Sequence, residues 1–154
     1  MERSGRRLLL FSLASFVAVV LLASALGPAQ KALAGTEAAR AIALFHAHFD
    51  QLCWLGSAAL GATLLFLARA YRGAAWAPAL VSWAYPAGAL TFSCAHAVKA
   101  LGLALDLPAL PRAAYPVIAS LGGVLLLVAA FGVGAIVASS LRRAGAAERE
   151  AGAR

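Results

Sequence analysis

The sequence alternates between four long apolar segments and short polar connections. The apolar segments cover about residues 8–26, 37–68, 78–103 and 115–141. Each is about 20 or more residues long, the length that an α-helix needs to cross a hydrocarbon core of ~30 Å at 1.5 Å per residue. The pattern predicts an all-α fold, an integral membrane four-helix bundle that occupies residues 1–154 as one domain.

Residues that start or stop helices separate these segments. Gly27 and Pro28 are expected to end the first helix. Thr36 is a suitable N-cap for the second, with Glu37 in the first turn. Between the third and fourth segments lies LDLPALPRAAYP, whose three prolines are incompatible with a helix interior.

The composition agrees with a membrane protein. The chain is 63% hydrophobic and 12% charged, far from the ~25% charged residues of an ordinary soluble domain. A water-soluble fold is therefore excluded. The formal net charge of +7 does not indicate a nucleic-acid partner, because the basic residues flank the apolar segments, and the expected surroundings are the lipid bilayer.

The distribution of lysine and arginine predicts the orientation. The N-terminal segment, the second connection and the C-terminal segment hold nine of these residues, whereas the other two connections hold three: Lys31, Arg40 and Arg112. This bias predicts that both termini are cytoplasmic, in a multi-pass protein of the inner (plasma) membrane. In an alternative interpretation, Ala23-Ser24-Ala25 ends a cleaved signal peptide, which leaves the orientation of the other three helices unchanged.

All three histidines lie in two of the apolar segments. His46 and His48 are in the second and His96 is in the third, at positions that place them in the same, outer half of the membrane. Ionisable groups inside a membrane cost on the order of 2.5–3.5 kcal/mol each, so they are candidates for function. Histidines that only join helices are the simpler alternative, but clustering at one depth favours a cofactor or catalytic site.

Helical spacing divides the polar residues into two stripes. His46, Asp50, Cys53 and Ser57 form one, and Tyr85, Ala89, Ser93 and His96 form the other, with Lys99 one turn further on. Both stripes are expected to face the bundle interior, because lipid offers no hydrogen-bonding partners.

Imidazole side chains are the usual axial ligands of haem iron. His46, His48 and His96 are therefore the candidate metal ligands, and Trp54 is a candidate for lining a cofactor pocket. His48 lies about 200° around an ideal helix from His46, so the two do not easily share one metal ion. The sequence lacks C-x-x-C-H, which excludes covalent attachment of haem and leaves haem b.

Asp50, Lys99 and Tyr85 are the candidate catalytic residues. Asp50 could form an ion pair with Lys99 or orient a ligating imidazole. In a cofactor-free membrane enzyme, His46 and Asp50 would act as a base pair and Lys99 would bind an anionic head group.

The last apolar segment contains no ionisable side chain and provides small residues at a spacing of four. These are Ala119 and Gly123, and then Ala130, Gly134 and Ala138. Such rows allow helices to pack closely, either within the bundle or in a homo-oligomer.

One motif carries a resemblance. The stretch from His46 to Trp54, HAHFDQLCW, resembles the H-x-H-x-N-x-x-G-W stretch of small haem-copper-oxidase-like membrane proteins, in which histidines at a helix start serve haem. Asp50 replaces the asparagine and Cys53 the glycine. The chain also resembles styrene oxide isomerase, through four membrane helices in a chain of this length and the pair Ala47-His48 in the second.

The second resemblance implies a trimer with haem b, whose ferric iron acts as a Lewis acid on an epoxide oxygen. It makes His48 the axial ligand, although Trp54 stands where that family has an asparagine. Periodicity instead favours His46, and His96 is either a second ligand or a distal group.

The leading hypothesis is a haem b protein acting on a lipophilic small molecule or a redox partner. It is an isomerase or oxidoreductase if a coordination position is open, and an electron-transfer cytochrome subunit if two histidines bind the iron. The alternatives are a cofactor-free membrane enzyme and a structural subunit of a membrane complex.

Overall fold

The computed structural model describes residues 1–152, which form helices joined by short loops, with no strand among them. The first helix is α1 (Glu2–Ala32). A second rod consists of α2 (Glu37–His48), the π-helical segment η1 (Phe49–Gly56) and α3 (Ser57–Leu67), which follow one another without a break. It is followed by α4 (Trp76–Ala104), the short π-helical η2 (Leu110–Ala114) and α5 (Tyr115–Gly152).

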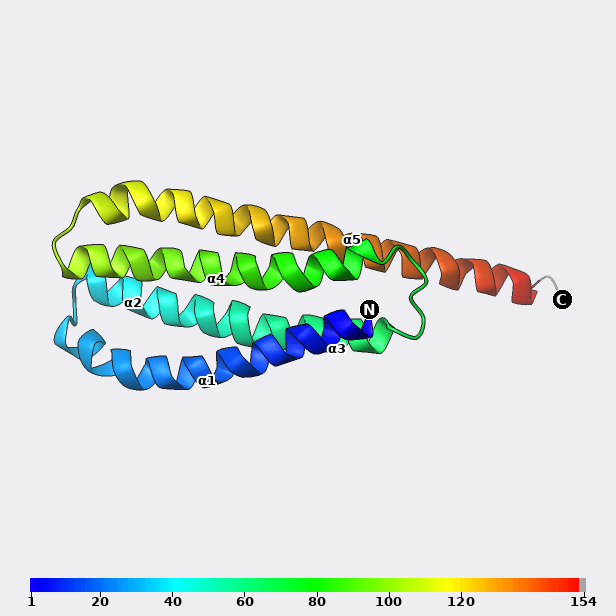
Figure 1. The fold of residues 1–154 in the computed structure, drawn as a ribbon, viewed down its shortest axis with the longest axis horizontal. Coiled ribbons are helices and arrows are strands. Elements are labelled where there is room, and N and C mark those ends of the chain that lie inside the picture. The colour runs from blue at the N-terminus through cyan, green and yellow to red at the C-terminus, as the bar shows by residue number, and fades with distance from the viewer. Residues whose placement is uncertain (153–154) are drawn as a thin grey trace.

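These elements make four antiparallel rods (Figure 1). Each contains a segment long and apolar enough to cross a membrane: Glu2–Ala32, Glu37–Leu67, Trp76–Ala104 and Leu110–Arg143. The predicted all-α bundle of four helices is therefore confirmed, at the level of helix length and composition. Large apolar side chains cover its outside, among them Phe66 at 85% and Phe131 at 78% exposure, which suits contact with lipid.

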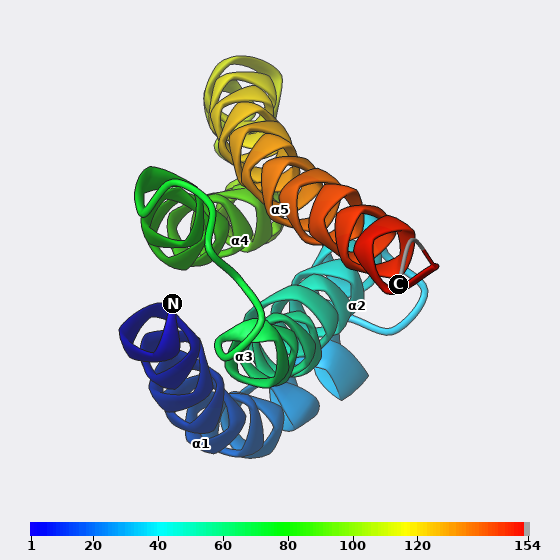
Figure 2. The same ribbon diagram turned by 90° about the vertical axis from the view of Figure 1, so that its right-hand side faces the viewer.

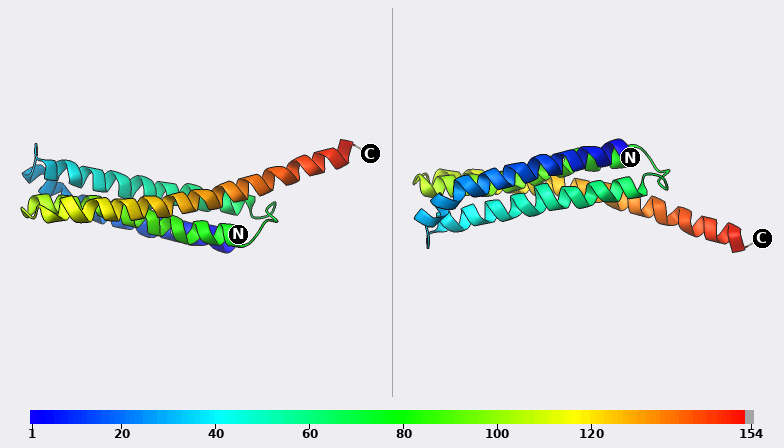
Figure 3. Two further views of the ribbon diagram at one scale, coloured as in Figure 1. Left: turned by 90° about the horizontal axis from the view of Figure 1, so that it is seen from above. Right: turned by 90° about the horizontal axis from the view of Figure 1, so that it is seen from below.

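α4 is the central helix of the bundle. It contacts α5 on one side and α1 and α2 on the other, whereas the described part of α5 makes no backbone approach to α1, α2 or α3. Seen along the bundle, α4 and α5 lie side by side, and α1 pairs with the α2–α3 rod (Figure 2). The N-terminus and the α3–α4 connection lie at one end, where α5 also extends past the other rods (Figure 3).

Glycines bring α4 and α5 close together. A Cβ atom on Gly122 would lie 2.5 Å from the backbone nitrogen of Phe92, and one on Gly88 would lie 2.9 Å from that of Leu126. The predicted small-residue rows lie elsewhere, because a Cβ atom on Gly123 or Gly134 would meet no atom within 4 Å. The face of α5 that packs closely on α4 therefore contains Gly122 and Gly132 instead.

Several predicted helix boundaries need correction. α1 continues through Gly27 and Pro28 to Ala32. The proline segment becomes helical at Leu110, because Pro111 lies in the first turn of η2, where a helix does not use the backbone N–H. α5 runs to Gly152 rather than Leu141, through residues rich in the helix formers alanine, glutamate and arginine.

The start of the second span is confirmed. The Thr36 hydroxyl accepts a hydrogen bond of 3.2 Å from the backbone N–H of Ala39, and Glu37 lies in the first turn of α2. Thr36 therefore satisfies one of the donors that a helix N-terminus leaves unpaired.

Candidate functional site

The second span is interrupted at its middle by the π-helical segment η1. A π-helix departs from the α-helical hydrogen-bonding pattern, and two backbone carbonyls of η1 accept side-chain hydrogen bonds from neighbouring helices. Tyr85 of α4 donates to the Leu52 carbonyl at 3.1 Å, and Ser12 of α1 donates to the Trp54 carbonyl at 3.0 Å. The π-helical segment is thus hydrogen-bonded to both α1 and α4.

Gly56 is required where η1 meets Tyr85. A Cβ atom at this position would overlap the Tyr85 hydroxyl oxygen, so any larger residue would push the tyrosine away. The close approach explains why a glycine stands at the end of the π-helical segment.

The π-helix changes which residues share a face. Its hydrogen bonds join residues five apart, so His48 and Cys53 both point to α4. The Cys53 sulfur lies 4.0 Å from the Ser93 hydroxyl, and the His48 ring meets His96. The predicted stripe that joined His46 to Cys53 assumed an unbroken α-helix and is wrong for His46.

The rings of His48 and His96 are stacked. Their centroids lie 4.5 Å apart, with 7° between the planes. Phe92 places its ring edge-on to His48 at 5.3 Å, and Tyr115 does the same to His96 at 5.3 Å. The two histidine-bearing spans therefore do meet at one depth, and we call these four residues the histidine cluster.

A backbone hydrogen bond fixes the tautomer of His48. Its Nδ1 lies 2.7 Å from the carbonyl oxygen of Leu44, one turn earlier. A carbonyl only accepts, so Nδ1 carries the proton and Nε2 of the neutral ring has a free lone pair. This arrangement is the one that metal-ligating histidines typically use.

His96 is buried, with 6% of its surface exposed, and its Nδ1 has no hydrogen-bonding partner among the described residues. The second predicted stripe agrees with the structure, since Ala89 and Ser93 are fully buried on the same face of α4. α4 thus presents one continuous line of small and polar side chains to the second span.

Lys99 does not pair with Asp50. Its Nζ lies 3.9 Å from a carboxylate oxygen of Glu37 and 5.8 Å from the centre of the Tyr115 ring. The predicted Asp50–Lys99 ion pair is therefore wrong: Lys99 reaches to the start of the span, where a partner and water are closer. One carboxylate oxygen of Asp50 is buried without a hydrogen-bonding partner in the described structure.

His46 and Trp54 face α1 instead of the histidine cluster. His46 lines a shallow groove of about 260 Å³ together with α1 residues that include Ala23 and Gln30. The Trp54 ring packs on Phe16 with centroids 4.7 Å apart. The structure therefore brings together two of the three predicted histidines and leaves the third on another face.

The geometry limits how a metal or haem could be held. Within residues 1–152, no three histidine, cysteine, aspartate or glutamate side chains are grouped so that they could share a metal ion. A haem iron bound by two histidines has the macrocycle between them, and the stacked rings of His48 and His96 leave no space for it. The contact with the Leu44 carbonyl leaves Nε2 of His48 as an imidazole nitrogen with a free lone pair.

Sequence reasoning did not identify two aromatic members of the cluster as site residues. Phe92 lies four residues before His96, so helical spacing alone could have placed it there. Tyr115 follows the proline-rich connection, and no periodicity relates it to α4.

Comparison with models of protein families found no match, and comparisons with curated proteins and with solved structures found none of significance.

Proposed function

We propose that this chain is a membrane protein that binds haem b through a single axial ligand, Nε2 of His48, and acts on a lipophilic small molecule. The observation that carries the proposal is the 2.7 Å contact between His48 Nδ1 and the Leu44 carbonyl. It holds the ring in one orientation and leaves the nitrogen that binds iron unprotonated.

The position of the ring supports this proposal. His48 ends α2, twelve residues into its span, at a depth of about 16 Å along the helix. An imidazole there has little access to water, and polar groups at such depth are rare unless they have a function. Phe92 and Tyr115 supply apolar walls of the kind that surround buried cofactors.

The open side of the cluster suggests where a large planar group and a lipophilic molecule would lie. α2 and α5 both contact α4, but the described residues show no close backbone approach between α2 and α5. The His48 side chain is half-buried. Bound ferric iron would supply a Lewis acid, as the resemblance to styrene oxide isomerase implies.

The other residues of the site have separate roles in this proposal. His96 supports the His48 ring by stacking. Lys99 and Tyr115 lie toward the membrane surface, where Lys99 can attract an anionic group, and Asp50 remains a candidate for proton transfer. Tyr85 positions η1, because its hydroxyl is already bonded to the Leu52 carbonyl.

A second candidate function is that of a cofactor-free enzyme. The buried and unpartnered Nδ1 of His96 favours it, because such a group can take part in proton transfer to a bound molecule. In that case the stacked pair of His48 and His96 would replace the predicted pair of His46 and Asp50.

Absorption spectroscopy of detergent-purified protein, combined with iron analysis and haem extraction, tests these proposals. Binding through one histidine predicts a Soret band and a spectrum that changes when carbon monoxide is added to the reduced protein. A low-spin spectrum that does not respond to carbon monoxide would support an electron-transfer cytochrome. Protein without haem in haem-supplemented expression would contradict the leading proposal.

The basic end of the bundle supports a cytoplasmic location of both termini, in the inner (plasma) membrane. The arginines near the N-terminus, in the α3–α4 connection and in the last part of α5 belong to this end (Figure 1). The positive-inside rule places such an end in the cytoplasm. A C-terminal fluorescent-protein fusion should be bright, whereas a C-terminal alkaline phosphatase fusion should be inactive.

A further inference from the structure

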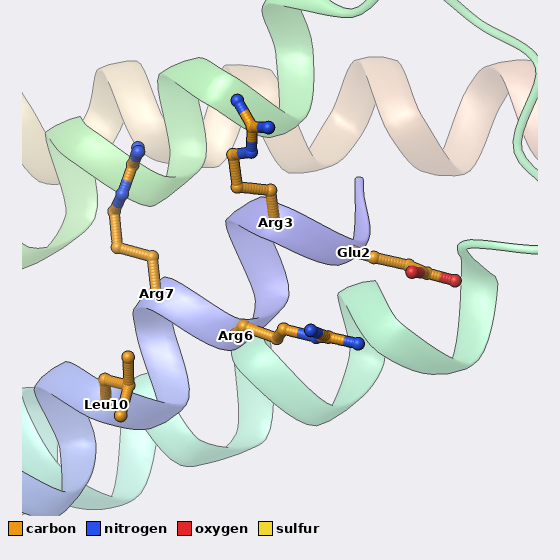
Figure 4. A pocket seen from close by; sticks show the side chains of 5 residues that line it. All are labelled: Glu2, Arg3, Arg6, Arg7 and Leu10. Atoms are coloured by element: carbon orange, nitrogen blue, oxygen red, sulfur yellow. The ribbon is translucent and has the colours of Figure 1, made fainter.

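Three arginines line one pocket at the start of α1. Arg3, Arg6 and Arg7 surround a space of about 480 Å³ together with Glu2 and Leu10 (Figure 4). Within the described part of the chain, none of the three guanidinium groups forms an ion pair with a carboxylate. Three positive charges against one negative leave the lining with a net charge of +2, so the pocket suits an anion.

Arg7 is held in place by α4. Its Nη1 donates a hydrogen bond of 3.2 Å to the Ser82 hydroxyl, and its guanidinium carbon lies 4.2 Å from the centre of the Trp83 ring. Figure 4 shows the side chains of Arg3 and Arg7 extending in the same direction, toward α4. One guanidinium of the pocket is thus already ordered before a ligand arrives, which reduces the entropy lost on binding.

An apolar stripe continues from this pocket along α1. Leu10, Leu13, Val17 and Leu21 are 69%, 61%, 52% and 65% exposed, and their spacing places them on the face opposite the buried Leu8. From Leu10 to Leu21 the helix rises about 16 Å, roughly half of a hydrocarbon core ~30 Å thick. The stripe therefore has the length of one leaflet.

We propose that this face of α1 is a binding site for an anionic phospholipid. Arg3 and Arg7 bind the phosphate, Arg6 adds positive charge to the pocket lining, and an acyl chain lies along the stripe from Leu10 to Leu21. Trp83, 66% exposed beside Arg7, lies where indole rings typically meet the head groups. The continuous apolar stripe favours a lipid over a soluble anion, and the site is independent of the histidine cluster.

Native mass spectrometry of the full chain in mixed micelles tests the site. The probes are phosphatidylglycerol, phosphatidylcholine and inorganic phosphate. We expect the protein to retain phosphatidylglycerol in preference to phosphatidylcholine, and Arg3→Gln to weaken that binding about fivefold. Arg7→Gln should weaken it further because the ordered guanidinium is lost.

Arg149→Gln is the matched control, since it removes the same charge at the same end of the bundle, on the part of α5 that extends past the other rods (Figure 3). It should leave phosphatidylglycerol binding within twofold of the original protein. Arg3 forms no hydrogen bond in the structure, so Arg3→Gln tests the site even if Arg7→Gln fails to fold. Equal retention of both lipids, or equal losses in Arg3→Gln and Arg149→Gln, would overturn the proposal. Displacement of the lipid by millimolar phosphate would overturn the assignment to a phospholipid.

Discussion

The Tyr85 hydroxyl donates a hydrogen bond of 3.1 Å to the carbonyl of Leu52, and thereby joins α4 to the irregular middle of the second span. The same hydroxyl occupies the space that any side chain at Gly56 would need. The π-helical segment η1 is therefore stabilised by a side chain of another helix, α4.

Tyr85→Phe should destabilise the protein by about 1 kcal/mol, because it removes a hydrogen bond that joins two helices. The measurement is unfolding in mixed micelles, followed by circular dichroism. Tyr115→Phe is the control, since no hydrogen bond of the Tyr115 hydroxyl is seen in the structure. Equal stability of the two variants would show that the Tyr85 hydrogen bond contributes nothing.

The contact between α4 and α5 predicts opposite effects of alanine at two adjacent glycines. Gly122→Ala should cost about 1–3 kcal/mol, because its Cβ would lie 2.5 Å from the Phe92 backbone. Gly123→Ala should be neutral or slightly stabilising, since its Cβ enters open space and alanine favours the helix. Thermal unfolding of both variants in detergent measures the difference. A Gly123 variant as unstable as the Gly122 variant would mean that both faces of α5 are packed.

Periodicity and the resemblance to styrene oxide isomerase assign the axial ligand to different histidines, and the proposed haem site predicts which substitution abolishes haem binding. His48→Ala should lose the Soret band, because it removes the nitrogen left free by the Leu44 carbonyl. His46→Ala should keep it, since His46 faces α1. Haem content per protein, measured by the pyridine haemochrome method, compares the two. Loss of haem in His46→Ala but not in His48→Ala would identify His46 as the axial ligand, as periodicity favours.

Thr36→Ala should destabilise the second span by ~1 kcal/mol, because the Ala39 N–H loses its capping oxygen. Thr63→Ala provides the control. The Thr63 hydroxyl bonds to the Ala59 carbonyl within an exposed helical turn, where replacement by alanine costs little. Chemical unfolding of the two variants gives the comparison, and a Thr63 variant that is the less stable of the two would contradict it.

Much of the fold follows from the sequence by simple physics. The four apolar segments specify the four rods, and Thr36 specifies where the second begins. The spacing of Ser93 and His96 correctly predicted the inward face of α4, because that helix is regular over this stretch. Such predictions depend on one residue and its helical neighbours.

The site was less predictable because it depends on a change of helical period. No single residue in FDQLCWLG predicts a π-helix. The π-helical segment is accompanied by hydrogen bonds from Ser12 and Tyr85, which belong to other spans. An unbroken α-helix would have aligned His46 with Cys53, and this is why His46 was assigned to the interior. The ion pair between Asp50 and Lys99 could not be judged from helical spacing for a similar reason. A long flexible lysine side chain can reach carboxylates on other turns and helices, and Lys99 lies near Glu37.

The absence of a close backbone approach between α2 and α5 has a kinetic consequence for the proposed reaction at His48. A lipophilic compound would reach the ring sideways, through the acyl chains, without crossing a water-filled entrance. Turnover would then follow the mole fraction of the compound in the lipid rather than its total concentration. Adding inert lipid to proteoliposomes at constant protein and compound should slow the reaction by surface dilution.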